Sequence, residues 1–204
     1  MQKFAEKALR LAFHLPWHYA LIRRILARRG EVSLEEARFL GALVQRANPA
    51  RPIVEIGTLF GGSTRVLAIL KAPETRLITV DCFRWNPFGL SRKQHAEVTR
   101  TILSDAGSSS NIELLQMDKA DFYSSYSDDP PGLVFLDANH SYESTLEDID
   151  WARSVGAEII AGHDYSPRFP GVIRAVDDSG GASRIVGTLF ELAHSGSHSR
   201  TARS

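Results

Sequence analysis

The sequence has few features of a secreted or membrane protein. Its one cysteine, Cys82, excludes an internal disulfide bond and is typical of a reducing compartment. No run of about 18 apolar residues lacks a charge, so we expect no transmembrane helix. Charged residues at positions 6, 7 and 10 interrupt the apolar residues near the N-terminus, unlike the continuous apolar core of a signal peptide. These absences predict a cytoplasmic protein.

An excess of charge of either sign is also missing. Lys and Arg number 24, as do Asp and Glu, which gives a formal net charge of zero. Broad electrostatic binding of nucleic acid needs a basic face, so we expect no nucleic-acid partner. Hydrophobic residues make up 43% of the 204 residues. This composition and length predict one globular domain with a core of its own.

The N-terminal region, residues 1–49, is expected to be a helical extension. Residues 2–29 fit helices with a break near Pro16, and several arginines make this segment basic. We interpret it as a helical cap packed on the domain, with a basic amphipathic helix at a membrane surface or partner as the alternative. The segment 33–36, Ser-Leu-Glu-Glu, has the form of a capping box and predicts the start of a further helix.

Strand-like and helix-like segments alternate from residue 52 onward. This alternation implies right-handed crossovers and a parallel sheet covered by helices on both faces. Two short strand-like runs at 184–186 and 188–192 are expected to form an antiparallel edge, and the tail at 195–204 is expected to be disordered. The other strands are predicted at 52–56, 76–81, 111–116, 132–136 and 157–161, and helices at 62–71, 90–106, 119–125, 141–154 and 169–178.

The most informative stretch is Ile-Val-Glu-Ile-Gly-Thr-Leu-Phe-Gly-Gly-Ser-Thr at residues 53–64. An apolar strand ends in an acid and a glycine, and a glycine-rich turn then opens a helix. Gly57 permits a sharp turn, and Gly61 and Gly62 leave room for a ligand beside the free amides of the helix start. Because Leu59 occupies the second glycine position, the turn is not the Gly-x-Gly-x-x-Gly of dinucleotide enzymes.

This turn resembles the first motif of class I S-adenosylmethionine-dependent methyltransferases, where it cradles the amino-acid part of the cofactor. Four successive strands end in an acid, namely Glu55, Asp81, Asp118 and Asp137. They end at the edge of an open parallel sheet where ligands bind. An acid after the second strand can accept hydrogen bonds from a ribose diol, and the Met-Asp pair after the third can contact an adenine. Each acid alone could also be a helix cap, Asp118 above all.

The candidate cofactor-binding residues are therefore the turn and these strand ends. Phe60 would pack against the cofactor or fill the core, and Cys82 has the alternative role of a small apolar filler. The complete set is Glu55, Gly57, Thr58, Phe60, Gly61, Gly62, Ser63, Thr64, Asp81, Cys82, Met117, Asp118 and Asp137.

Three later motifs sharpen the resemblance. Asp-x-x-His-Ser-Tyr at 137–142, His-Asp-Tyr at 163–165 and Pro-Gly-Val-x-x-Ala at 170–175 occur together in the small bacterial methyltransferases of the family numbered 24. That family is similar to macrocin O-methyltransferase and cephalosporin-hydroxylase-type enzymes. The likeness covers about residues 50–192. It implies a Rossmann-like, seven-stranded α/β methyltransferase domain at 50–194, mostly parallel with an antiparallel edge.

The resemblance also implies the chemistry. In metal-using relatives, an acid after the fourth strand and an acidic pair after the fifth hold a divalent cation, and these positions map to Asp137, His163 and Asp164. His140 would be the general base, with Asp137 as the other catalytic residue. Since His163 departs from the acidic pair, Mn²⁺, Fe²⁺ or Zn²⁺ becomes more favoured relative to Mg²⁺. A metal-free enzyme is an alternative, in which Asp137 would touch the cofactor or substrate and His140 or His163 would act as base. His163 and Asp164 could also be a hydrogen-bonded pair that orders the loop after the strand.

The predicted function is methyl transfer from S-adenosyl-L-methionine to a hydroxyl group of a small molecule or a glycan. A non-catalytic cofactor- or partner-binding protein on the same fold is the alternative, because a fold does not fix a function. The sequence identifies neither the acceptor nor the oligomeric state, so a homo-oligomer stays open.

Overall fold

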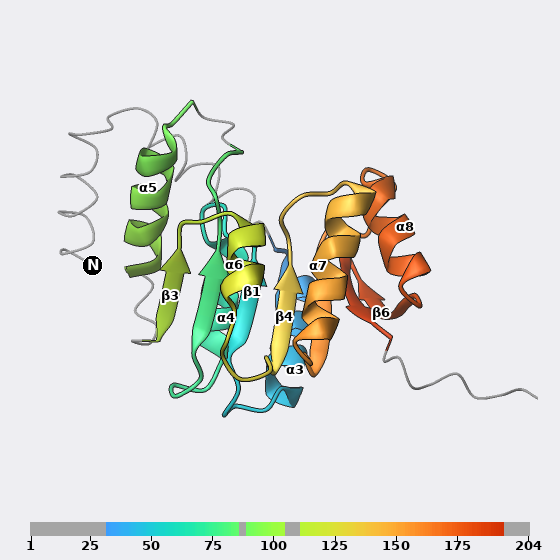
Figure 1. Ribbon diagram of the computed structural model, residues 1–204. Helices are drawn as coiled ribbons and strands as arrows, with labels where there is room; N and C mark the ends of the chain where they lie inside the picture. Colours follow the sequence, from blue (N-terminus) through green and yellow to red (C-terminus); the bar gives the residue numbers. More distant parts are fainter. Residues whose placement is uncertain (1–31, 86–88, 105–110, 194–204) are drawn as a thin grey trace, which may run out of the picture.

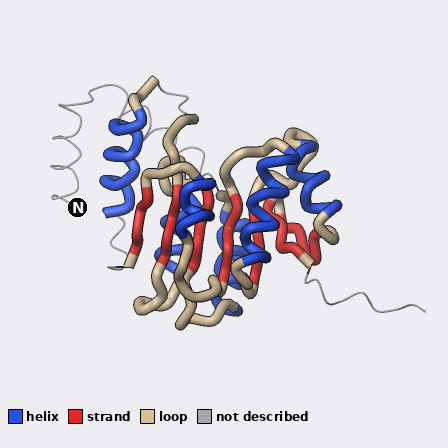
Figure 2. Tube along the Cα trace, viewed as in Figure 1, coloured by secondary structure: helices blue, strands red, loops and turns tan. Residues whose placement is uncertain are grey.

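The computed structural model describes residues 32–85, 89–104 and 111–193. These residues form a seven-stranded sheet with helices on both faces (Figures 1 and 2). The strands are β1 (Ile53–Ile56), β2 (Leu77–Val80), β3 (Ile112–Leu115), β4 (Leu133–Leu136), β5 (Ile159–Gly162), β6 (Ala182–Val186) and β7 (Leu189–Leu192). The helices are α3 (Leu34–Arg46), α4 (Gly62–Leu70), α5 (Arg92–Ser104), α6 (Lys119–Ser125), α7 (Tyr142–Ser154) and α8 (Pro170–Asp178).

The sheet has the strand order β3-β2-β1-β4-β5-β7-β6. β1 to β5 pair in parallel, whereas β7 runs antiparallel to both of its neighbours. All residues of β1, β2, β4 and β5 are buried. This burial is expected for parallel strands covered on both faces, and it explains why their sequences are mostly apolar, with Glu55 and Thr79 as exceptions.

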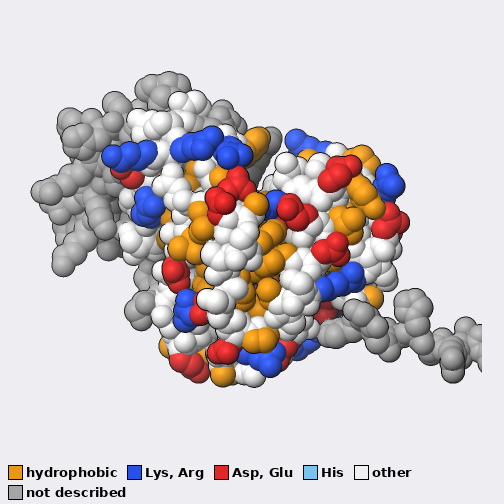
Figure 3. Space-filling model, viewed as in Figure 1, with side chains coloured by type: hydrophobic (Ala, Val, Ile, Leu, Met, Phe, Trp, Pro, Cys, Tyr) orange, Lys and Arg blue, Asp and Glu red, His pale blue; other side chains and the backbone are white. Residues whose placement is uncertain are grey.

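Two layers of core side chains hold the helices to the sheet. On one face, alternate strand residues such as Val54 and Val134 pack against Phe122 of α6, Ile149 of α7 and Val176 of α8. The other face of the sheet packs against α3 and α4. In the space-filling view of the first face, hydrophobic side chains show in the middle, between α6 and α7 (Figure 3).

The predicted fold class and elements are confirmed. Each strand and helix expected between residues 52 and 192 is present with its ends within about two residues of the prediction. The capping box is also present, since the Ser33 side chain accepts from the Glu36 amide while the Glu36 carboxylate accepts from the Ser33 amide.

Some predictions lie outside the described residues or are untested. The helices expected over 2–29 and the tail at 195–204 are outside them, and the domain boundaries at 49/50 and 194/195 stay predictions. Within the described residues, no helix has the length and apolar character needed to cross a membrane.

Candidate functional site

Four acid-bearing strand ends lie side by side. In the order β3-β2-β1-β4, the strands carry or are followed by Asp118, Asp81, Glu55 and Asp137. Carboxyl ends of neighbouring parallel strands meet at one edge of the sheet, which is where ligands bind in open α/β folds. The structure therefore brings the predicted residues to one edge, although they play different local roles there.

The glycine turn lies directly against the end of β4. Gly57 has a φ of 100°, and a Cβ atom there would lie 2.0 Å from the Asp137 carbonyl oxygen. Gly61 has a φ of 84° and is the N-cap of α4, where a Cβ would lie 2.8 Å from Leu103. Both positions require glycine because of backbone conformation and close packing. This packing keeps the turn beside the segment that begins at Asp137.

Glu55 stabilises the turn through buried hydrogen bonds. Its side chain is fully buried and accepts hydrogen bonds from the hydroxyls of Ser63, Thr64 and Thr79. The Thr79 hydroxyl is in turn 2.6 Å from that of Thr58. Burial raises the pKa of Glu55 to about 7, against the hydroxyl donors, which favour the anion. Since the side chain has no exposed surface, its predicted influence on a cofactor would run through these hydroxyls.

Asp81 binds the backbone of the same turn. One carboxylate oxygen accepts from the Thr58 amide at 3.0 Å and the Leu59 amide at 2.7 Å. The other accepts from the Phe83 amide at 2.6 Å. An ionised carboxylate has about four acceptor positions, so capacity remains for a ribose hydroxyl. The predicted ribose contact is thus compatible with a second role as an anchor of the turn.

An aromatic cluster lies behind the turn. The Phe60 ring is buried and lies 4.1 Å from the His95 ring, and Phe83 lies 4.9 Å from His95 on an edge. Burial lowers the pKa of His95. Phe60 therefore fills the core, which is one of its two predicted roles.

The remaining candidates flank the edge. Asp118 is the N-cap of α6, accepting from the Ala120 amide, and pairs with Arg84 at 3.2 Å. Met117 is partly buried against the core, and Cys82 is a free thiol of intermediate exposure. The cap role weighed for Asp118 is therefore present, and its predicted adenine contact stays a prediction.

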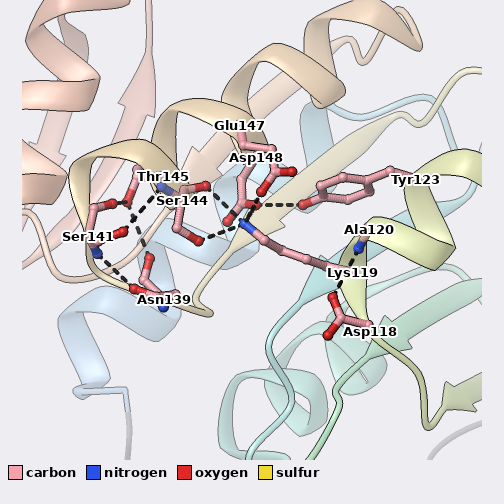
Figure 4. Close-up of polar contacts among 10 residues, drawn as sticks. All are labelled: Asp118, Lys119, Ala120, Tyr123, Asn139, Ser141, Ser144, Thr145, Glu147 and Asp148. Atoms are coloured by element: carbon pink, nitrogen blue, oxygen red, sulfur yellow. Dashed lines mark hydrogen bonds and ion pairs between the residues drawn. The ribbon is translucent and has the colours of Figure 1, made fainter.

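A partly buried ion pair joins α6 to α7 at this edge (Figure 4). Lys119, the first residue of α6, donates to the Ser144 hydroxyl at 2.7 Å and pairs with Asp148 of α7. Tyr123 donates to the same Asp148 oxygen at 2.7 Å, and its ring stacks on Trp151. Because α6 follows the end of β3 and α7 follows the loop after β4, the contact fixes the spacing of these two loops.

A second cluster lies after β4 and β5 and contains the predicted metal ligands. Donor atoms of Asp137, His163 and Asp164 all lie within 4.8 Å of one another. The His163 Nδ1 atom is 3.5 Å from Asp137 Oδ2 and 3.8 Å from Asp164 Oδ1. His140 Nε2 lies 2.9 Å from Asp164 Oδ2 and 3.8 Å from Asp137 Oδ1. Asp164 has a positive φ of 62°, a strained conformation for a residue with a side chain.

Opposite charges dominate this cluster. The Asp137 and Asp164 carboxylates raise the pKa of His140 to about 9. Burial opposes the charged form of His163, but Asp137, Asp164 and Glu36 raise its pKa to about 9 as well. Burial would raise the pKa of Asp137, yet the two imidazoles lower it. The cluster thus attracts positive charge.

The residues fit a divalent cation. Two ligands about 2.1 Å from a four-coordinate ion are separated by roughly 3.4 Å, close to the distances from His163 Nδ1 to the two carboxylates. These distances are at or beyond the limit for direct hydrogen bonds. Carboxylate and imidazole donors together suit Mn²⁺ or Zn²⁺.

Two site residues were missed at the sequence level. The sequence indicates Glu36 only as part of a capping box, yet its Oε1 atom lies 3.6 Å from His163 Nε2. Lys119 carries no motif, and its role depends on α6 and α7 being neighbours. The capping box predicts the position of Glu36 on α3. The residues around it in the sequence do not indicate that its carboxylate points toward His163.

Comparisons with known proteins agree with the fold. A family model described as a methyltransferase domain, of the family numbered 24, matches residues 54–165. The catechol O-methyltransferase of Mycobacterium tuberculosis is 33% identical over 151 residues, which are 72% of this chain and 62% of that protein. The chain therefore spans less than two thirds of that relative.

Solved structures also resemble the chain. A cofactor-bound protein from MTB, Rv0187, is 27% identical, with a TM-score of 0.63 over 80% of this chain and 82% of that one. An O-methyltransferase from Bacillus cereus in complex with SAH is 24% identical, with a TM-score of 0.61 over 91% and 86% of the two chains. The second likeness shows the fold alone.

Proposed function

Since the chain belongs to this methyltransferase family, we propose that it transfers a methyl group from S-adenosylmethionine to a hydroxyl of a small molecule, with a divalent cation in the site. One observation carries the proposal. Gly57 packs against the Asp137 carbonyl, which places the cofactor-type turn next to the Asp137, His163 and Asp164 cluster. The methyl donor and the acceptor oxygen would therefore meet between them.

The proposed acceptor has two adjacent hydroxyl groups on an aromatic ring. This class follows from the name of the mycobacterial relative, a catechol O-methyltransferase. A cation at the site would polarise such a hydroxyl and lower its pKa. Asp137, His163 and Asp164 would hold the ion and leave positions open for the acceptor.

His140 is the proposed general base. Its ring lies 4.3 Å from that of Phe169, which shields one face from water, and Nε2 faces the two carboxylates. In the ion-free protein these carboxylates raise its pKa to about 9, so the ring carries a proton near pH 7. Carboxylates engaged by a cation hold that proton less tightly, and ion binding would therefore release it.

A calorimetric titration with S-adenosylhomocysteine tests the cofactor part of the proposal. It is done in EDTA and then with added Mn²⁺ or Mg²⁺, followed by methyl-transfer assays on catechol, phenol and a sugar. Micromolar binding and transfer to catechol over phenol are expected. Absence of binding under every condition would overturn the methyltransferase proposal, and binding without transfer to any acceptor would favour the non-catalytic alternative.

A further inference from the structure

Glu36 contacts the candidate metal centre from outside the matched family segment. It lies on α3, whereas the family model begins at residue 54. Its Oε1 atom lies 3.6 Å from Nε2 of His163, and His163 is the residue at which this chain departs from the acidic-pair pattern. The histidine that replaces an acid at position 163 and the additional carboxylate of Glu36 thus occur side by side.

The Glu36 carboxylate has a fixed position. Oε2 accepts from the Ser33 amide at 2.8 Å, and Oε1 accepts from the Thr188 amide at 2.9 Å and the Thr188 hydroxyl at 3.0 Å. A Cβ at Gly187 would lie 2.6 Å from Oε1, so the β6–β7 turn can approach only because it has glycine there. The residue is 7% exposed. Helix α3 and the turn therefore hold the carboxylate against the imidazole.

The two nitrogens of His163 face different partners. Nδ1 faces Asp137 and Asp164 at 3.5 and 3.8 Å, and Nε2 faces Glu36. A metal ion binds the imidazole once one of its two protons has left. The Glu36 carboxylate is at 3.6 Å, beyond hydrogen-bond distance of Nε2, but its negative charge favours keeping the remaining proton on Nε2 and leaving the Nδ1 lone pair free. Metal-binding histidines commonly direct their other N–H group to a carboxylate in this way.

We propose that Glu36 is a positioning residue that makes His163 a metal ligand through Nδ1. The proposal rests on the metal-assisted function proposed above and deepens it. Glu36 orients the ring toward the two carboxylates, and the resulting donor set of two oxygens and one nitrogen selects Mn²⁺ or Zn²⁺ over Mg²⁺.

Calorimetric titration with Mn²⁺ alone tests this role in the full-length protein. Glu36→Gln removes the charge and keeps one side-chain oxygen, which can accept from Thr188, whereas its NH2 group cannot accept from the Ser33 amide. We expect it to weaken Mn²⁺ binding by about 10- to 100-fold, with metal-free binding of S-adenosylhomocysteine unchanged. Glu35→Gln, on the same turn of α3 and exposed, is the matched control and should bind Mn²⁺ like the parent protein.

A double-mutant cycle separates positioning from a purely structural role. His163→Ala should weaken Mn²⁺ binding, and adding Glu36→Gln should cost nothing further, because Glu36 acts through that ring. Thr188→Val removes one of the two Thr188 hydrogen bonds to the carboxylate and leaves the charge and the Thr188 amide in place, so it should lower thermal stability and weaken Mn²⁺ binding less than Glu36→Gln does.

The opposite results would overturn the proposal. These are Mn²⁺ affinity unchanged in Glu36→Gln, additive losses in the cycle, or a loss in Thr188→Val equal to that in Glu36→Gln. Absence of Mn²⁺ binding to the parent protein would also overturn it, while the separate titration with S-adenosylhomocysteine would still decide the methyltransferase proposal.

Discussion

Two acids at neighbouring strand ends have opposite surroundings. Glu55 on β1 is fully buried among three hydroxyl donors, and its pKa is raised to about 7. Asp137 after β4 lies between two imidazoles that lower its pKa. Both follow the same sequence pattern of an apolar strand that ends with an acid. The three hydroxyl donors make Glu55 a support for the turn, whereas the two imidazoles leave Asp137 able to bind a ligand.

The same contrast separates the two halves of the site. Around the glycine turn, the carboxylates of Glu55 and Asp81 accept hydrogen bonds from hydroxyl groups and amides of the protein. Around Asp137, one short contact joins His140 Nε2 to Asp164 Oδ2 at 2.9 Å, and the other charged atoms lie 3.5 to 3.8 Å apart, too far for strong direct bonds. The glycine-turn half is thus held together by hydrogen bonds within the protein. The half around Asp137 is suited to accept a positive ion between its charged groups.

The largest effect is expected at His140. His140→Ala should lower turnover by about 10²- to 10⁴-fold, the usual contribution of a general base, while affinity for S-adenosylhomocysteine stays unchanged. This outcome would sharpen the contrast, since it would place chemistry in the second half and cofactor binding in the first. Single-turnover kinetics and calorimetry measure the two quantities. Full activity of the variant would remove His140 from the role of base.

The next largest effect concerns the contact that joins the halves. Lys119→Met leaves Asp148, which is 2% exposed at its side chain, without its cation. Loss of one partner of a buried pair should lower the free energy of unfolding by about 3 kcal/mol, measured by urea denaturation. Arg76→Met is the control, because it breaks pairs to Glu113 and Asp128 that are all substantially exposed and should cost less than about 1 kcal/mol.

An equal loss in the two variants would contradict a special role for the Lys119 contact. A loss of stability in Lys119→Met without any change in affinity for S-adenosylhomocysteine would show that the spacing of the two loops matters for folding alone.

The sequence could predict much of this site because parallel strands have a simple geometry. The resemblance to metal-using methyltransferases predicts Asp137, His163 and Asp164 as one site, and the meeting of neighbouring strand ends at one edge of a sheet makes their convergence possible. The contacts that orient those residues could not be predicted in the same way. Glu36 meets Thr188 across 152 residues of sequence, and the direction of its carboxylate depends on how α3 packs against the β6–β7 turn.

The buried acid of the first half should have a measurable pH dependence. The pKa of Glu55 is about 7 in the folded protein against an ordinary 4.5, so folding favours its protonated form. That stabilisation is complete below about pH 4.5 and is lost as the pH rises through 7, with a total on the order of 3 kcal/mol. Glu55→Gln, which stays neutral, should remove this component.

Urea denaturation at pH 5 and pH 7.5 measures the Glu55 effect without cofactor. The exposed Glu97→Gln variant should keep the pH dependence of the parent protein. The free energy of unfolding of Glu55→Gln could instead change between the two pH values as it does in the parent protein. That result would mean that the three hydroxyls hold the acid ionised throughout, and the contrast with Asp137 would then be smaller than we infer.

The smallest effect is expected at Asp81. Its carboxylate belongs to the glycine-turn half of the site but can still accept a further hydrogen bond. Asp81→Ala should weaken binding of S-adenosylhomocysteine by about tenfold or more, since hydrogen bonds to a charged group contribute about 1.5–3 kcal/mol. The loss has two sources, the predicted ribose contact and the amides of Thr58 and Leu59 that the carboxylate now holds.

A 2′,3′-dideoxy analogue of S-adenosylhomocysteine distinguishes these two sources. If Asp81 binds the ribose diol, the parent protein should bind the analogue about tenfold more weakly than the natural ligand, and Asp81→Ala should bind both equally. If the variant still discriminates between the two ligands as the parent does, Asp81 only anchors the turn. The ribose would then be recognised elsewhere, and this carboxylate would share the purely supporting role of Glu55.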